Sequence, residues 1–138
     1  MTRKMICLFS FVALLSFVEL GLPVNPADLE TYPVKLSIIN ELTNDKASFT
    51  SSVTEGGVLF GVLNNLNGTN GFSYSYSVHK TLGLYLESVN GVAGSVNDHT
   101  YWELLTERKG RLTPLETGIG CYQPKKDEHI ILRFTKWD

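Results

Sequence analysis

The chain has 138 residues, with 12 basic and 14 acidic side chains and a formal net charge of −2. Neither a strong attraction for phosphates nor a clustered basic face is available, so the composition argues against a nucleic-acid or anionic-membrane partner. The length suits one domain with a single modest core.

The first 21 residues have the pattern of a secretory signal peptide. Arg3 and Lys4 precede an apolar run over 6–18, which is too short to span a bilayer comfortably. We expect cleavage between Ser16 and Ala27, with an uncleaved anchor as the alternative. Nothing later in the sequence is apolar enough to be a transmembrane helix, so the mature protein is expected to be secreted and extracellular, without a membrane partner.

Cleavage would also remove one of the two cysteines, Cys7, and leave Cys121 alone in the mature chain. A disulfide framework is then excluded, and two interpretations of Cys121 stay open: a small buried side chain in a strand, or an intermolecular bridge.

The remaining sequence divides into a linker over 22–33, which contains three prolines, and one domain over 34–138. Alternating apolar residues and turn signals predict strands over 34–42, 47–53, 72–78, 82–89, 101–105, 118–122 and 129–137. One segment has helical periodicity, with apolar residues at 58, 59, 62, 63 and 66. Ser52 or Thr54 could cap this helix, and Asn67-Gly68 would end it. One helix on a mixed sheet of five to seven strands is an α+β fold, and a β-grasp arrangement is the simplest with that order of elements.

The segment from Asn97 to Leu105 raises a question about faces. Tyr101, Glu103 and Leu105 fall on one face of the predicted strand, and Trp102 and Leu104 fall on the other. The segment is either a strand buried on both faces, or a strand with one face in the core and the other against a second surface.

Polar motifs offer little catalytic chemistry. His79, His99 and His129 have spacings that fit no short metal motif, so no bound metal ion is expected. Asp98-His99 could belong to a triad, but no Gly-x-Ser-x-Gly elbow accompanies it, so we expect no enzymatic activity. Asn67-Gly68-Thr69 is an N-glycosylation sequon, and in a secreted chain it makes Asn67 a candidate glycosylation site.

Several segments together resemble the carboxy-terminal β domain of the cobalamin carriers, the family of intrinsic factor, transcobalamin and haptocorrin. The resemblance covers about residues 34–137 and rests on Gly83-Leu84, Val89-Asn90, Thr100-Tyr101-Trp102-Glu103-Leu104-Leu105, Thr113-Pro114-Leu115, Gly118-Ile119, Tyr122, Glu128-His129-Ile130 and Phe134-Thr135.

The resemblance implies a module that covers one side of a carried cobalamin or related corrinoid, with weak affinity on its own. The residues that match the ligand-contacting segments of the family are Thr81, Leu82, Gly83, Leu84, Tyr85, Leu86, Trp102, Glu103, Leu104, Leu105, Thr113, Pro114 and Leu115. The implied protein partners are a helical-barrel domain or a receptor. The alternative is a secreted protein-interaction module of the same fold that has lost cobalamin binding.

Three departures from the family pattern bear on this expectation. Leu82 stands where intrinsic factor has Trp, which removes flat aromatic area. The segment 107–110 reads as an insertion before Thr113. The sequence has no counterpart of the family's helical barrel, so the cobalt-coordinating histidine of that barrel is not expected, and none of the three histidines considered above matches it.

Overall fold

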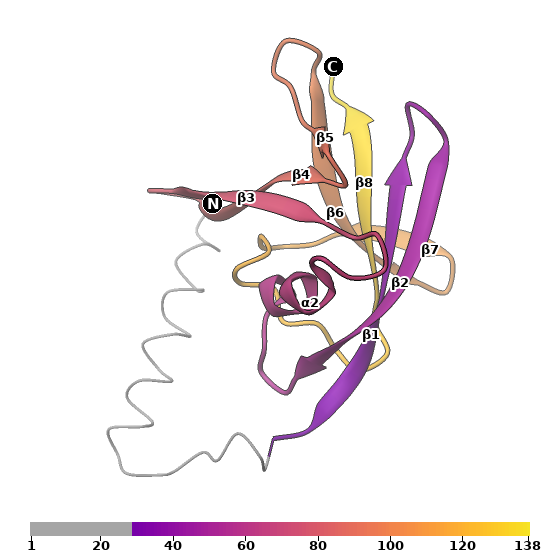
Figure 1. Cartoon of the computed structure of the whole chain (residues 1–138), viewed down its shortest axis with the longest axis vertical. Helices are drawn as coiled ribbons and strands as arrows, with labels where there is room; N and C mark the ends of the chain where they lie inside the picture. The colour runs from indigo at the N-terminus through magenta and orange to yellow at the C-terminus, as the bar shows by residue number, and fades with distance from the viewer. Residues whose placement is uncertain (1–28) are drawn as a thin grey trace.

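The computed structural model describes residues 29–138, in which two β-sheets enclose one short helix (Figure 1). The elements are β1 (Thr31–Asn40), β2 (Asp45–Thr54), α2 (Leu59–Leu66), β3 (Tyr74–His79), β4 (Gly83–Val89), β5 (Val92–Ala93), β6 (Thr100–Arg108), β7 (Arg111–Pro114) and β8 (His129–Lys136). The α+β class is thus confirmed. The predicted signal peptide and most of the predicted linker lie outside the described residues.

The larger sheet has five strands in the order β2-β1-β8-β6-β7. Its centre is a parallel pair of the first and last strands, with Lys35 opposite His129 and Ile38 opposite Leu132. All other pairs in this sheet are antiparallel. The sheet is therefore mixed, as the sequence predicted, and β1 begins at Thr31, earlier than expected.

The smaller sheet has three strands in the order β3-β4-β5. A single sheet of five to seven strands was expected, so this part of the prediction is wrong. A bulge lies in β4, because the consecutive residues Ser75 and Tyr76 of β3 pair with Ser88 and Leu86 and leave Glu87 as the extra residue. Strand bulges increase local twist and bend, which suits a hairpin that turns away from the larger sheet (Figure 1).

The helix forms where the apolar periodicity predicted it. Leu59, Val62, Leu63 and Leu66 are its buried residues, and Asn67 is its C-cap. The expected side-chain caps Ser52 and Thr54 are wrong, because the N-cap is Val58 and makes no side-chain hydrogen bond. The first helical amides are satisfied by the chain over 118–122 instead.

The core fills the space between the helix and one face of the larger sheet. Its fully buried members include Leu36 of β1, Leu63 of α2, Phe72 before β3, and Ile130 and Leu132 of β8. Phe49 of β2 packs its ring edge against Phe72 at a centroid distance of 5.4 Å. The fold is held mainly by this apolar layer.

The segment 118–122, predicted as a strand, is a turn. The amide nitrogens of Cys121 and Tyr122 both donate to the carbonyl oxygen of Gly118, at 3.1 and 3.0 Å. Cys121 is half-buried in this turn, so the interpretation of Cys121 as a buried side chain in a strand is wrong. Within residues 29–138, α2 is far too short to cross a bilayer, and no helix there qualifies as a membrane span.

Candidate functional site

The β3–β4 hairpin carries the first group of predicted site residues. Thr81 and Leu82 form its turn, and Gly83 to Leu86 lie on β4. The hairpin projects beyond α2, on the left in Figure 1. Its exposed large hydrophobic side chains are Tyr76, Val78, Leu82 and Tyr85, of which Val78 is 74% exposed. Apolar groups gathered on a projecting hairpin are typical of a contact surface.

The two faces of this hairpin differ. Leu86 is buried and Leu84 packs against the core, whereas Tyr85 points to the other face beside the ring of His79, at a centroid distance of 5.4 Å. Phe60 of α2 supports the core-facing side through edge contacts with Tyr74 and Tyr76. The hairpin is therefore anchored to the helix, while its tip stays open to solvent.

The second group of predicted residues, Thr113 to Leu115, ends β7 and borders a hollow of about 570 Å³. The amide of Leu115 donates to the carbonyl oxygen of Leu104 at 3.0 Å, which continues the β6–β7 pairing by one residue. The hollow is lined by Thr106, Thr113, Pro114, Leu115, Glu116, Thr117, Cys121, Tyr122, Gln123 and Lys125. Its lining combines apolar surface with hydroxyl, amide, carboxylate and ammonium groups, a mixture that suits a ligand with an apolar body and peripheral amide groups.

The 118–122 turn joins these two groups. Leu84 of the hairpin lies against Gly118 and Gly120, and Tyr122 at the end of the turn lines the hollow. The structure therefore places 81–86 and 113–115 at two sides of one loop, although 27 or more residues separate them in sequence.

The third group, Trp102 to Leu105, is not part of this surface. Trp102 is buried in the core, where its indole ring tilts against Phe134 at 5.0 Å. Glu103 and Leu105 lie on the opposite face of the sheet, where Arg133 donates two hydrogen bonds to Glu103, at 2.7 and 2.9 Å. Trp102 is buried on one face of β6 and Leu105 on the other, while Tyr101 and Glu103 are half-buried, which favours the first of the two interpretations.

Sequence reasoning missed most of the residues that line the hollow, in particular Glu116, Thr117, Gln123 and Lys125. Their signal was weak, because they belong to an irregular loop with no periodic pattern. The loop is nevertheless fixed by hydrogen bonds. Tyr122 donates a short hydrogen bond to Glu128, and Lys125 donates its amide to the same carboxylate at 2.8 Å. The pKa of Tyr122 is raised, mainly by burial and secondly by its hydrogen bond to Glu128.

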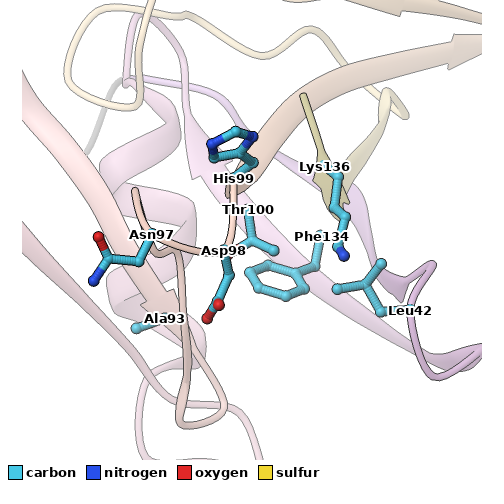
Figure 2. A pocket seen from close by; sticks show the side chains of 8 residues that line it. All are labelled: Leu42, Ala93, Asn97, Asp98, His99, Thr100, Phe134 and Lys136. Atoms are coloured by element: carbon cyan, nitrogen blue, oxygen red, sulfur yellow. The ribbon is translucent and has the colours of Figure 1, made fainter. Parts of the chain in front are cut away.

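A second hollow, of about 520 Å³, lies at the other end of the larger sheet (Figure 2). Phe134 and Thr100 form its base, Asp98 and Lys136 lie on either side of Phe134, and Leu42 closes it from the β1–β2 turn. His99 has a left-handed backbone with φ 56°, and its ring stacks on Trp137 at 5.2 Å. This end combines exposed apolar groups with both signs of charge.

The three histidines lie on different elements, and residues 29–138 contain no group of three or more His, Cys, Asp or Glu side chains that could hold a metal ion. His129 binds Ser37 at 2.7 Å and lies 3.5 Å from Glu107. Ser37 is buried and also bonds Ser48 at 3.2 Å. This network ties β1, β2, β6 and β8 together, so His129 has a structural role.

Comparisons with known proteins give a consistent set of relatives, although no family model matches. The chain is 32% identical to cobalamin binding intrinsic factor of Canis lupus familiaris over 128 residues, which cover 87% of this chain and 30% of that protein. It is 33% identical to human transcobalamin-2 over 112 residues, covering 81% of this chain and 24% of that protein. The chain thus spans less than a third of the length of these relatives.

Solved structures support the same fold. A crystal structure of haptocorrin in complex with Cbi matches with a TM-score of 0.66 and 24% identity, over 78% of this chain and 26% of that one. A putative metal binding protein from Ruminococcus gnavus matches with a TM-score of 0.57 and 11% identity, over 78% of this chain and 99% of that one. At these identities the two matches establish the fold only.

Proposed function

We propose, from the premise that this chain belongs to the family of intrinsic factor, the transcobalamins and haptocorrin, that its domain binds a corrinoid and covers one side of it. The observation that carries the proposal is the joining of the exposed β3–β4 hairpin and the hollow beside Thr113 by one loop. An apolar projection next to a hollow lined by both apolar and polar groups suits a macrocycle with amide side chains around its rim.

The proposed ligand surface comprises Thr81 to Leu86 and Thr113 to Leu115. Trp102, Glu103 and Leu105 are better assigned to supporting the sheet, since they are buried or ion-paired away from the hollow. Leu104 connects the two roles, because its carbonyl oxygen holds Leu115 in place.

We further propose weak binding by this chain alone. It matches 24–30% of the length of its carrier relatives, so it would supply only part of the contacts that a whole carrier makes. A loss of about 4 kcal/mol weakens binding about a thousandfold, so we expect a dissociation constant in the micromolar range or above. A helical-barrel domain or a receptor would then be its protein partner.

The direct test is a visible-absorbance titration of cyanocobalamin and of cobinamide with the purified chain. Binding should perturb the corrin spectrum, and Leu82→Ser and Leu84→Ser should each weaken it. A matched control is Val96→Ser, since Val96 is exposed but lies in the β5–β6 turn, outside the proposed surface. An unperturbed spectrum at millimolar protein, or equal loss in the control, would contradict the proposal.

Membership of this family also supports proposals about secretion, domain boundaries, glycosylation and fold class. We propose secretion, with residues 1–21 as signal peptide, 22–33 as linker and 34–138 as the domain, and glycosylation of Asn67, which is exposed at the end of α2. Glycosidase treatment should lower the mass of the wild-type protein and leave the mass of Asn67→Gln unchanged, which tests the glycan.

We also propose the β-grasp class, because the parallel pair of first and last strands and the helix after β2 support it.

A protein-interaction module is the second candidate function. The end of the sheet shown in Figure 2 favours it, because Leu42 is exposed there. Val96 and Trp137 are also exposed, and both contact His99, which lines the hollow at that end. Such a module would bind a protein partner while leaving the corrin spectrum unchanged. Loss of that partner's binding in Trp137→Ala, with no corrinoid effect in any variant, would favour this function over the first.

A further inference from the structure

We propose that Gly120 is a positioning residue, whose missing side chain lets the β3–β4 hairpin seat against the 118–122 turn. The inference rests on the proposed corrinoid site and extends it, because seating the hairpin fixes Thr81–Leu86 relative to Thr113–Leu115. Neither glycine of this turn belongs to the proposed ligand surface.

The contact with Leu84 carries the proposal. A Cβ atom built on Gly120 would lie 3.1, 3.2 and 3.3 Å from Leu84 Cδ1, Cγ and Cβ. Carbon atoms attract each other best at about 3.5–4.0 Å, so even a methyl group here would repel the leucine side chain. With alanine at this position, Leu84 would have to move away from the turn by a few tenths of an ångström.

The turn cannot easily move away to relieve such a contact. Its carbonyl oxygens at Ile119 and Tyr122 accept hydrogen bonds of 2.7 Å from the amides of Phe60 and Leu59, the first residues of α2. Ile119 is also buried in the core. Since a shift of the turn would leave helix amides without partners, the hairpin would have to move instead.

Movement of the hairpin would reach the proposed ligand surface. Leu84 lies at the middle of the segment 81–86, and its neighbours Leu82 and Tyr85 are exposed on the hairpin. The residues beside the hollow lie on the other side of the turn and would stay in place. The positions of residues 81–86 and 113–115 relative to each other would therefore change.

Gly118 provides a matched control within the same turn. A Cβ atom there would meet only the carbonyl oxygen of Leu84, at 3.5 Å, which is an ordinary contact. Gly118 and Gly120 both lie outside the left-handed region of backbone conformation, so alanine at either position meets no φ penalty. The two substitutions differ mainly in how close they come to Leu84.

The test compares Gly120→Ala and Gly118→Ala in the cyanocobalamin titration, under conditions where both chains are folded. Gly120→Ala should weaken binding about tenfold, consistent with the usual cost of overpacking, and Gly118→Ala should leave it unchanged. Leu84→Ala removes two of the three crowded atoms, Cγ and Cδ1, so Gly120→Ala should weaken binding less in the Leu84→Ala chain than in the wild-type chain. Equal effects of the two glycine substitutions, or a full loss from Gly120→Ala in the Leu84→Ala chain, would overturn the proposal.

Amide hydrogen exchange separates this inference from the proposed function. Gly120→Ala should speed exchange in β4, over Gly83–Val89, and Gly118→Ala should not. If the wild-type chain leaves the corrin spectrum unchanged, the proposed function fails, and the exchange result still decides whether Gly120 seats the hairpin. Identical exchange in both variants would show that it does not.

Discussion

The indole nitrogen of Trp102 donates a 2.8 Å hydrogen bond to the backbone carbonyl oxygen of Val92. This bond ties β6 of the larger sheet to β5 of the smaller one, while the ring itself packs in the core with 8% of the residue exposed. Trp102 is therefore a joint between the two sheets, and its substitution should affect folding before ligand binding.

Trp102→Ala should lower the free energy of unfolding by about 3–5 kcal/mol, because it removes a buried aromatic ring and leaves a cavity. Trp102→Phe keeps much of the apolar volume and should lower it less. Denaturant midpoints measure both effects. Val96→Ala is a suitable control, since Val96 is 81% exposed and should change the midpoint little. If the Trp102→Ala protein is folded but has lost corrinoid binding, Trp102 belongs to the ligand surface and this prediction is wrong.

Glu103→Gln should lower stability by about 0.5–1 kcal/mol, because Arg133 makes two charged hydrogen bonds to one oxygen of Glu103 at a partly exposed site. This pairing is also the first cause of the raised pKa of Arg133. Urea unfolding of Glu103→Gln, Arg133→Met and the double variant should give non-additive losses. Simple additivity would mean that the ion pair contributes nothing beyond the separate side chains. Corrinoid binding should stay unchanged in all three.

Two glycines should respond to alanine with opposite sign. Gly83 begins β4 with φ +71°, so Gly83→Ala should destabilise the protein by about 1 kcal/mol through backbone strain. Gly61 lies within α2 with open space where a Cβ would be, so Gly61→Ala should stabilise it by about 0.5–1 kcal/mol. Thermal unfolding of the pair measures the difference. A shift in the same direction for both would contradict the observed conformations.

Tyr74 should make stability fall in alkaline solution. Burial, reinforced by nearby Tyr76, raises the pKa of Tyr74 to about 12 from its ordinary value of 10.0, and its hydroxyl donates a short hydrogen bond to Asn64. Because the folded-state pKa is the higher one, this contribution is fully present below pH 10 and is lost as the pH rises toward 12. Tyr74→Phe should therefore lose less stability across that interval than the wild type, by urea unfolding at each pH.

Tyr85→Phe is the matched control for that experiment, since Tyr85 is an exposed tyrosine on β4. It should follow the wild-type profile between pH 10 and 12. If Tyr74→Phe and Tyr85→Phe give the same profile, alkaline loss of stability does not originate at Tyr74.

Sequence patterns predicted the elements whose burial is periodic. The stripe that includes Leu59, Val62, Leu63 and Leu66 is the buried face of α2, and the alternation in β8 buries Ile130, Leu132 and Phe134. The burial of these side chains can be predicted from the sequence, because a helix or strand turns the same face to the core at a fixed interval.

Features that depend on residues far apart in the sequence could not be predicted from such patterns. Gly118 to Tyr122 looks like a strand, yet it folds as a turn because its carbonyl groups are needed at the start of α2. The division into two sheets and the bulge in β4 belong to the pairing registers, which local sequence does not encode. The candidate site shares this limit, since the approach of Leu84 to Gly120 is set by tertiary packing.

The parallel pairing of β1 with β8 has a consequence for biosynthesis. A chain emerging from the ribosome can form the β1–β2 hairpin early, but the strand that lies between β1 and β6 is the last to be made. Until then Leu36 and Trp102 have no neighbour from β8, and the nascent apolar surface is exposed to chaperones and to other chains. Truncation before Ile130 should therefore yield insoluble material rather than a smaller folded domain.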